Sequence, residues 1–106
     1  MIIETNETLN KVYSGDIIIK PYANVTITGI VTGNIISDST SELTISGIVN
    51  GDITISDGST AIVSGIVNGT IYNKGFVTIT GIVNKVIGNE ETTVIKSGSI
   101  IGGQRQ

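Results

Sequence analysis

The fold of this chain is decided by the stretch Gly47-Ile48-Val49-Asn50-Gly51-Asp52-Ile53, because near-copies of it occur on both sides at a nearly constant spacing. One copy, Gly29 to Ile35, lies upstream, and another, Gly65 to Ile71, lies downstream at the same interval in the sequence. A shorter copy, Gly81 to Asn84, follows at a slightly shorter interval. Repeats of this kind indicate a solenoid, in which each unit buries its apolar face by stacking on the next.

Apolar residues alternate with polar residues through this unit. Around the central copy the odd positions are apolar or glycine, namely Leu43, Ile45, Gly47, Val49, Gly51, Ile53 and Ile55. A period of two residues is that of a β-strand, whose successive side chains point to opposite faces of a sheet. The glycines are expected at the corners between strands, because a residue without a Cβ atom lets another backbone segment approach closely.

We therefore predict an all-β, single-domain protein: a three-sided parallel β-helix, or β-solenoid, with about 17 to 18 residues per coil and five to six coils. The solenoid is expected over residues 9–102, with residues 1–8 as a lead-in or N-terminal cap and 103–106 as a polar tail. New coils should begin at Asn24, Glu42, Thr60 and Phe76. Three inward ladders should fill the interior: Ile27, Ile45, Val63 and Ile79; Val31, Val49, Val67 and Val83; and Ile17, Ile35, Ile53 and Ile71.

The types of side chain present argue against catalysis. The 106 residues include no histidine and no cysteine, which excludes Ser-His and Cys-His nucleophile arrangements, ordinary zinc sites and disulfides. The sequence also lacks a phosphate-binding loop and a metal-ligand cluster. We therefore expect a protein that is not an enzyme, with no catalytic, cofactor-binding or metal-binding residues, no cofactor and no small-molecule substrate.

Charge and hydropathy narrow the expected partners further. The net charge is −3 and the six basic residues are scattered, so nucleic acid is not an expected partner. No apolar stretch approaches the ~20 residues that cross a bilayer, and Met1-Ile2-Ile3-Glu4 lacks the basic region and long apolar run of a leader. We expect no membrane span and a cytoplasmic location.

The pattern Gly-x-Val-x-Gly-x-Ile, carried by Gly29 to Ile35, Gly47 to Ile53 and Gly65 to Ile71, resembles the core repeat of the bactofilins, a polymer-forming bacterial cytoskeletal family. The resemblance covers roughly residues 12–101. It implies a right-handed three-sided β-helix that stacks end to end into filaments. Two features depart from the family pattern: the outward positions are mostly uncharged, and Lys85 stands where earlier coils have glycine.

A ladder of outward apolar residues is the main candidate contact surface, formed by Val12, Ile30, Ile48, Ile66 and Ile82. A neighbouring outward row, Ile18, Ile36, Thr54 and Tyr72, is expected to extend the same apolar region. Contiguous exposed apolar surface normally marks a contact site, so we predict a homo-oligomer or one protein partner held there. The alternative is that β-branched residues simply favour strands, or that the corner turns these side chains inward.

Two polar columns have competing interpretations. Thr26-x-Thr28, Thr44-x-Ser46, Ile62-x-Ser64 and Thr78-x-Thr80 resemble the ice-binding face of threonine-rich β-solenoid antifreeze proteins, although threonine is also common on exposed strands. Asp16, Asn34, Asp52 and Thr70 form a column beside the corner glycines. Such columns can bind calcium on solenoids, but local hydrogen bonding to the backbone explains them equally simply.

These observations predict a non-catalytic scaffold that acts through protein–protein contacts, with a bactofilin-like self-associating structural protein as the favoured role. One alternative is a small acidic immunity or inhibitor protein that binds a basic toxin or nuclease, and another is a threonine-array ice-binding protein. If Val94 aligns with Val77, Lys96 falls inward and the last coil breaks register, which would oppose filament growth. Limited association through the Ile30, Ile48, Ile66 and Ile82 ladder is then expected.

Overall fold

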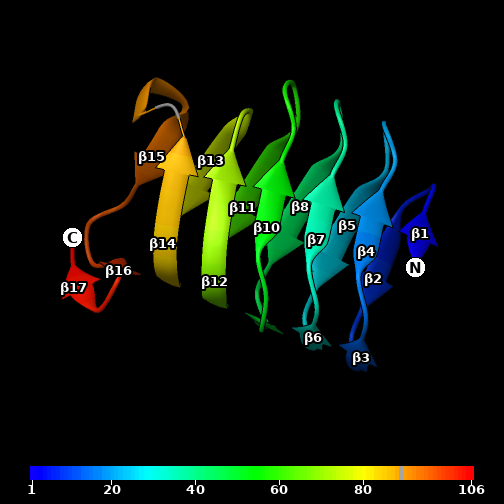
Figure 1. Cartoon of the computed structure of the whole chain (residues 1–106), viewed down its shortest axis with the longest axis horizontal. Helices are drawn as coiled ribbons and strands as arrows, with labels where there is room; N and C mark the ends of the chain where they lie inside the picture. The colour runs from blue at the N-terminus through cyan, green and yellow to red at the C-terminus, as the bar shows by residue number, and fades with distance from the viewer. Residues whose placement is uncertain (89) are drawn as a thin grey trace.

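The computed structural model describes residues 1–88 and 90–106, and the chain winds into a β-solenoid of about 5 turns with about 18 residues per turn (Figure 1). Strands of neighbouring turns pair in parallel at successive levels, so every face of the solenoid is a parallel sheet. The predicted all-β parallel β-helix is therefore confirmed. The longest dimension of the molecule is 34 Å.

The strands form three faces that run along the solenoid. Face 1 consists of β2 (Glu7–Leu9), β5 (Asn24–Ile27), β8 (Glu42–Ile45), β11 (Thr60–Val63), β13 (Phe76–Ile79) and β15 (Thr93–Ile95). Face 2 consists of β3 (Val12–Ser14), β6 (Ile30–Thr32), β9 (Ile48–Val49), the first residues of β12 (Ile66–Asn73) and β14 (Ile82–Gly88), and β16 (Ile100–Ile101). Face 3 consists of β1 (Ile2–Ile3), β4 (Ile17–Ile19), β7 (Ile35–Ser37), β10 (Ile53–Ile55) and the last residues of β12 and β14. A 3-10 helix, η1 (Glu90–Thr92), precedes β15, and β17 (Gln104–Arg105) pairs with β16 in the antiparallel sense.

The interior is filled by the three predicted ladders. Every one of their twelve members is at most 1% exposed, and each stacks on its equivalent in the next coil. The expected coil starts are also confirmed, because Asn24, Glu42, Thr60 and Phe76 are register partners on face 1. Dense stacking of like aliphatic side chains supplies most of the buried apolar surface, and hence most of the hydrophobic stabilisation.

The corner between face 3 and face 1 adds buried polar groups to this aliphatic core. Ser37 occupies the register of Ile19 and Ile55, and its hydroxyl group lies 2.5 Å from the hydroxyl group of Ser41. One coil further on from Ile55, the Asn73 amide donates to Thr93 Oγ1 at 2.8 Å and its oxygen accepts from the N–H of Gly75 at 3.0 Å. These polar side chains form hydrogen bonds with residues of the corner loops, as buried polar groups in proteins generally do.

The glycine corners hold the backbones of neighbouring coils in direct contact. A Cβ atom on Gly47 would clash with the carbonyl oxygen of Gly29, and a Cβ atom on Gly51 would clash with that of Gly33. The same clash occurs at Gly65 and at Gly69. The repeat therefore requires glycine here because the space of a side chain is taken by the preceding coil.

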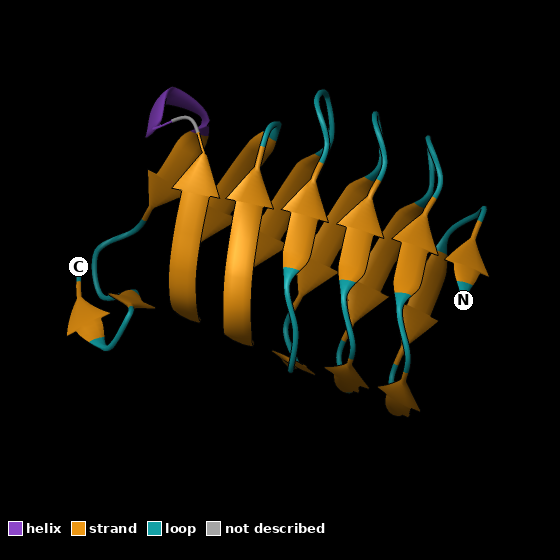
Figure 2. Cartoon of the chain, viewed as in Figure 1, coloured by secondary structure: helices purple, strands orange, loops and turns teal. Residues whose placement is uncertain are grey.

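The alignment of the later coils differs from the sequence prediction at two places. Lys85 pairs with Thr70, not with Gly69, because Asn84 alone lies opposite Asn68 and Gly69, so this corner is one residue shorter in the later coil. Both β12 and β14 continue unbroken through the corner. Figure 2 shows this difference, since loops join face 2 to face 3 in the earlier coils but not in these two. The second error concerns Val94, which pairs with Thr78, so Lys96 is exposed and not inward.

The regular sheets also reach further toward the N-terminus than residue 9. The strand β1 pairs with β4 on face 3, and β2 pairs with β5 on face 1. Residues 1–8, expected as a lead-in or cap, thus contribute strands to two faces. At the other end β17, within the expected polar tail, lies along β16. Among residues 1–88 and 90–106, no helix has the length and apolar character needed to cross a bilayer.

Adjacent residues on opposite sides of one strand provide a test of this architecture. Val49 is fully buried and Ile48 is half-buried on the outside. Val49→Asp places an unpaired charge in the aliphatic stack, so we expect the protein to be unfolded at room temperature. Ile48→Asp should cost on the order of 1 kcal/mol. Circular dichroism during thermal unfolding of both variants measures the difference, and a folded Val49→Asp beside an unfolded Ile48→Asp would mean that the two faces of β9 have been interchanged.

Candidate protein-contact surfaces

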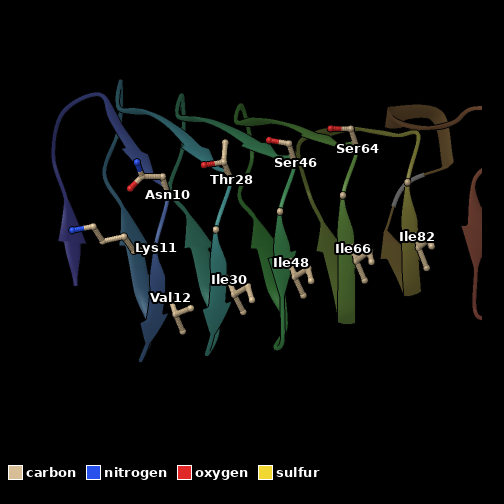
Figure 3. Close-up of a pocket in the computed structure, with 14 residues that line it drawn as sticks. Asn10, Lys11, Val12, Thr28, Ile30, Ser46, Ile48, Ser64, Ile66 and Ile82 are labelled. Atoms are coloured by element: carbon tan, nitrogen blue, oxygen red, sulfur yellow. The ribbon is translucent and has the colours of Figure 1, made fainter.

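A groove runs along the corner between face 1 and face 2 (Figure 3). Its floor is the backbone of the corner glycines Gly29, Gly47, Gly65 and Gly81, and its volume is about 780 Å³. The predicted apolar ladder forms one wall, and Asn10, Thr28, Ser46 and Ser64 form the other. The groove exists because the glycines bring the chain inward at this corner while the residues on both sides keep their outward side chains.

The ladder of Val12, Ile30, Ile48, Ile66 and Ile82 lies on the surface, as predicted, and not in the core. Val12 is 70% exposed and Ile82 is 42% exposed at the two ends, and the three isoleucines between them are half-buried. Each isoleucine shields its neighbours in the stack, and the recessed floor shields it further. The alternative that the corner turns these side chains inside is therefore excluded.

Thr28, Ser46 and Ser64 on the opposite wall of the groove carry hydroxyl groups that contact the backbone. The side-chain oxygens of Thr28, Ser46, Ser64 and Thr80 lie 3.2 to 3.4 Å from a carbonyl oxygen of the preceding coil. These hydroxyl groups form a second link between coils beside the main-chain ladder. Their column was noticed in the sequence as a threonine array, but its position across a groove from the isoleucines was not predicted.

The second predicted row, Ile18, Ile36, Thr54 and Tyr72, lies on face 3 and is not continuous with the ladder. Two polar columns separate them, one containing Thr32, Asn50 and Asn68 and the other containing Asn34, Asp52 and Thr70. The row is longer than predicted, because Ile2 pairs with Ile18 and Ile87 pairs with Tyr72. The sequence did not reveal these two members because fewer residues separate each of them from its partner than separate equivalent residues in the central coils.

The acidic column beside the glycines links the coils by hydrogen bonds. The Oδ1 atom of Asp16 accepts from the N–H of Asn34, that of Asn34 accepts from Asp52, and that of Asp52 accepts from Thr70, each at 2.9 Å. The bonds run between coils, so they are not the local turn bonds expected from the sequence. They explain the short acceptor side chains without a cation, and in the described part of the chain no cluster of three or more acidic side chains could hold a metal ion.

Comparison with known proteins identified no relative of this chain. No family model matches the chain, and no curated protein and no solved structure is significantly similar to it. Function must therefore be argued from the surfaces of the solenoid.

The column of acceptors makes a specific contribution to stability that can be measured. Asp52→Ala leaves the partly buried N–H of Thr70 without its acceptor, so we expect a loss of about 1 kcal/mol in the free energy of unfolding. Asp52→Asn keeps an acceptor oxygen at the same place and should stay within about 0.5 kcal/mol of the parent. Urea denaturation gives both values, and equal losses in the two variants would show that the charge, not the acceptor, matters.

Proposed function

We propose that the protein is a non-catalytic scaffold that acts through protein–protein contacts and associates with copies of itself, as the bactofilin resemblance implies. One observation carries the proposal: the apolar row on face 3 stays exposed although the interior is complete without it. Ile2, Ile36, Tyr72 and Ile87 are 58%, 43%, 40% and 44% exposed. An apolar row of this length on one flat sheet favours a contact role.

The chemistry of the remaining side chains favours contact over catalysis. Asp16 and Asp52 each use one carboxylate oxygen to hold the next coil, which gives them a structural task. The hydroxyl groups beside the groove are directed at backbone carbonyl oxygens and have no histidine to activate them. Binding another protein through a surface requires neither histidine nor cysteine.

Face 3 is better shaped for self-association than the groove. The isoleucines of the groove lie beside a recessed floor, so two copies of that corner would leave a gap between them. The strands β4, β7, β10, β12 and β14 instead lie side by side on the near face of Figure 1, where they present one broad sheet. We therefore assign the self-contact to face 3, although the sequence favoured the Ile30, Ile48, Ile66 and Ile82 ladder.

End-to-end stacking is the second mode of association that the bactofilin resemblance implies. Within the described residues, β1, β2 and β3 each pair on one side only, and an unpaired strand edge can accept a strand from another chain. At the other end, β17 covers the edge of β16 on face 2, where the N–H of Gln106 donates to the carbonyl oxygen of Ser99 at 2.7 Å, while β15 and the last residues of β14 pair on one side only. The two ends thus differ, which favours short assemblies over long filaments.

Binding of a separate protein in the groove is the other candidate function, and the groove itself is the observation that favours it. Among its described lining residues Lys11 is charged and none is acidic. A basic toxin or nuclease is attracted by acidic surface, so the immunity or inhibitor role gains no support from this site. An apolar segment of a partner fits its isoleucine wall better.

Two matched double variants test the proposed function and identify the surface. We expect the wild-type chain to sediment with a mass above that of one chain as its concentration rises. Ile36→Lys/Tyr72→Lys places two charges on face 3 and should leave a single folded chain at every concentration. Ile48→Lys/Ile66→Lys, the same change on the groove ladder, should keep the self-association.

The outcomes separate the candidates by sedimentation velocity and negative-stain imaging. Loss of association in the groove variant alone would move the contact to the groove. Fibres that survive both double substitutions would favour end-to-end stacking. A wild-type chain that stays single at millimolar concentration would contradict self-association altogether.

A further inference from the structure

Face 3 carries charged columns on both sides of its apolar row, and their signs change along the solenoid. One side column is Asp16, Asn34, Asp52, Thr70 and Lys85, and the other is Lys20, Asp38, Ser56 and Lys74. The first coils thus contribute Asp16 and Asp38, and the later coils contribute Lys74 and Lys85. Asp16 and Asp38 each accept one backbone hydrogen bond, from the N–H groups of Asn34 and Ser39, and the N-terminal ammonium group donates to the carbonyl oxygen of Asp16. Within the described residues none of the four side chains has a salt-bridge partner, which leaves the second carboxylate oxygen and both ammonium groups for a partner chain.

We propose that two copies pack face 3 against face 3 in opposite directions, related by a two-fold axis that passes beside Thr54 and runs along the strands. This arrangement rests on the proposed self-association and specifies its geometry. In this arrangement each column faces the equivalent column of the second chain, and the coils of the two chains run in opposite order. Asp16 then faces Lys85 of the second copy, and Asp38 faces its Lys74. Symmetry repeats both pairs, so four ion pairs border the contact.

The apolar row is complementary in the same arrangement. Ile18 meets Ile87 of the second copy, and Ile36 meets its Tyr72. Thr54, the short member at the middle of the row, meets itself at the two-fold axis. Large side chains therefore meet one another on both sides of a small central residue, and the interface needs no rearrangement of the backbone.

Other registers of the same two faces are less complementary. A shift of the two-fold axis by half a coil toward the N-terminus brings Lys20 against Lys74 and replaces the lysine opposite Asp16 by Thr70. If both solenoids run in the same direction, each side column faces the other side column of the second chain. Asp16 then meets Lys20 as the one kind of ion pair, and Asp38 no longer lies opposite Lys74. Electrostatic complementarity fixes register because unlike charges attract and like charges are costly when brought together.

The arrangement brings one like-charge pair together, Asp52 and its copy. These carboxylates lie at the border of the sheet, where water screens them, and Oδ1 of each is held by the N–H of Thr70 in its own chain. Five strands at ~4.8 Å spacing and five residues at ~3.3 Å each span roughly 400 Å². Stable dimers bury about 800 Å² per partner, so we expect a weak, concentration-dependent dimer.

A charge exchange tests the pairing between Asp38 and Lys74 directly. Asp38→Lys and Lys74→Asp each place like charges opposite one another, and each should weaken dimer formation about tenfold or more. An equimolar mixture of the two variants restores opposite charges across the interface and should associate like the wild type. Lys20→Asp serves as the control, because Lys20 takes no part in the four ion pairs.

A cysteine placed on the proposed axis supplies an independent measurement. The chain has no cysteine, so Thr54→Cys carries a single thiol, and a short bis-maleimide should join two copies through it. Thr44→Cys, on face 1 of the same coil and equally half-buried, is the matched control and should remain a single chain.

The readouts distinguish failure of this geometry from failure of the proposed function. Restored association in the mixture together with crosslinking at Thr54→Cys is the expected result. A wild-type chain that associates while the mixture stays dissociated, or while Thr44→Cys crosslinks as well as Thr54→Cys, would overturn the antiparallel arrangement and leave self-association standing. A wild-type chain that does not associate at all would overturn both.

Discussion

The structure depends on the close approach of backbones at the glycine corners. Where the carbonyl oxygen of Gly29 occupies the place of a side chain on Gly47, successive coils can stack at the strand spacing without a gap. The same approach continues at Gly65 and Gly81. Everything else follows from this spacing, because the inward valines and isoleucines meet their equivalents only if each coil lies directly on the one before it.

Side chains add a second set of links that maintain the same spacing. The acceptor column that begins at Asp16 holds the corner between face 2 and face 3, and the hydroxyl groups of the Thr28 column hold the corner between face 1 and face 2. The buried Ser41 and Asn73 hold the third corner. Each corner therefore has its own polar contacts, which leaves the outward middle of each face free to vary. That freedom is why face 3 can carry an apolar row and charges of changing sign.

The sequence predicted the features that depend on periodicity. Alternation around Val49 identified the strands and their buried side, and the repeat of glycines identified the corners. At Val94 the interval assumed from Val77 was one residue too long, because Val77 pairs with Thr93. At Lys85 the alignment failed because the corner after Val83 is one residue shorter than the corner after Val67. No pattern of residue types signals such a deletion. The groove was also missed, because whether a corner is recessed depends on backbone angles and not on the outward residues beside it.

The most direct test of the glycine constraint is the stability of Gly47→Ala compared with Ser46→Ala, measured by chemical denaturation. The added methyl group of Gly47→Ala meets a carbonyl oxygen that cannot move without separating two coils, so we expect a loss of about 1–3 kcal/mol or more in the free energy of unfolding. Ser46→Ala removes a hydroxyl group beside it whose contact with the carbonyl oxygen of Ile27 is long, at 3.4 Å, so it should change the same quantity by less than about 0.5 kcal/mol. If Gly47→Ala unfolds at the same denaturant concentration as the wild type, the coils are not held together by backbone contact at this corner.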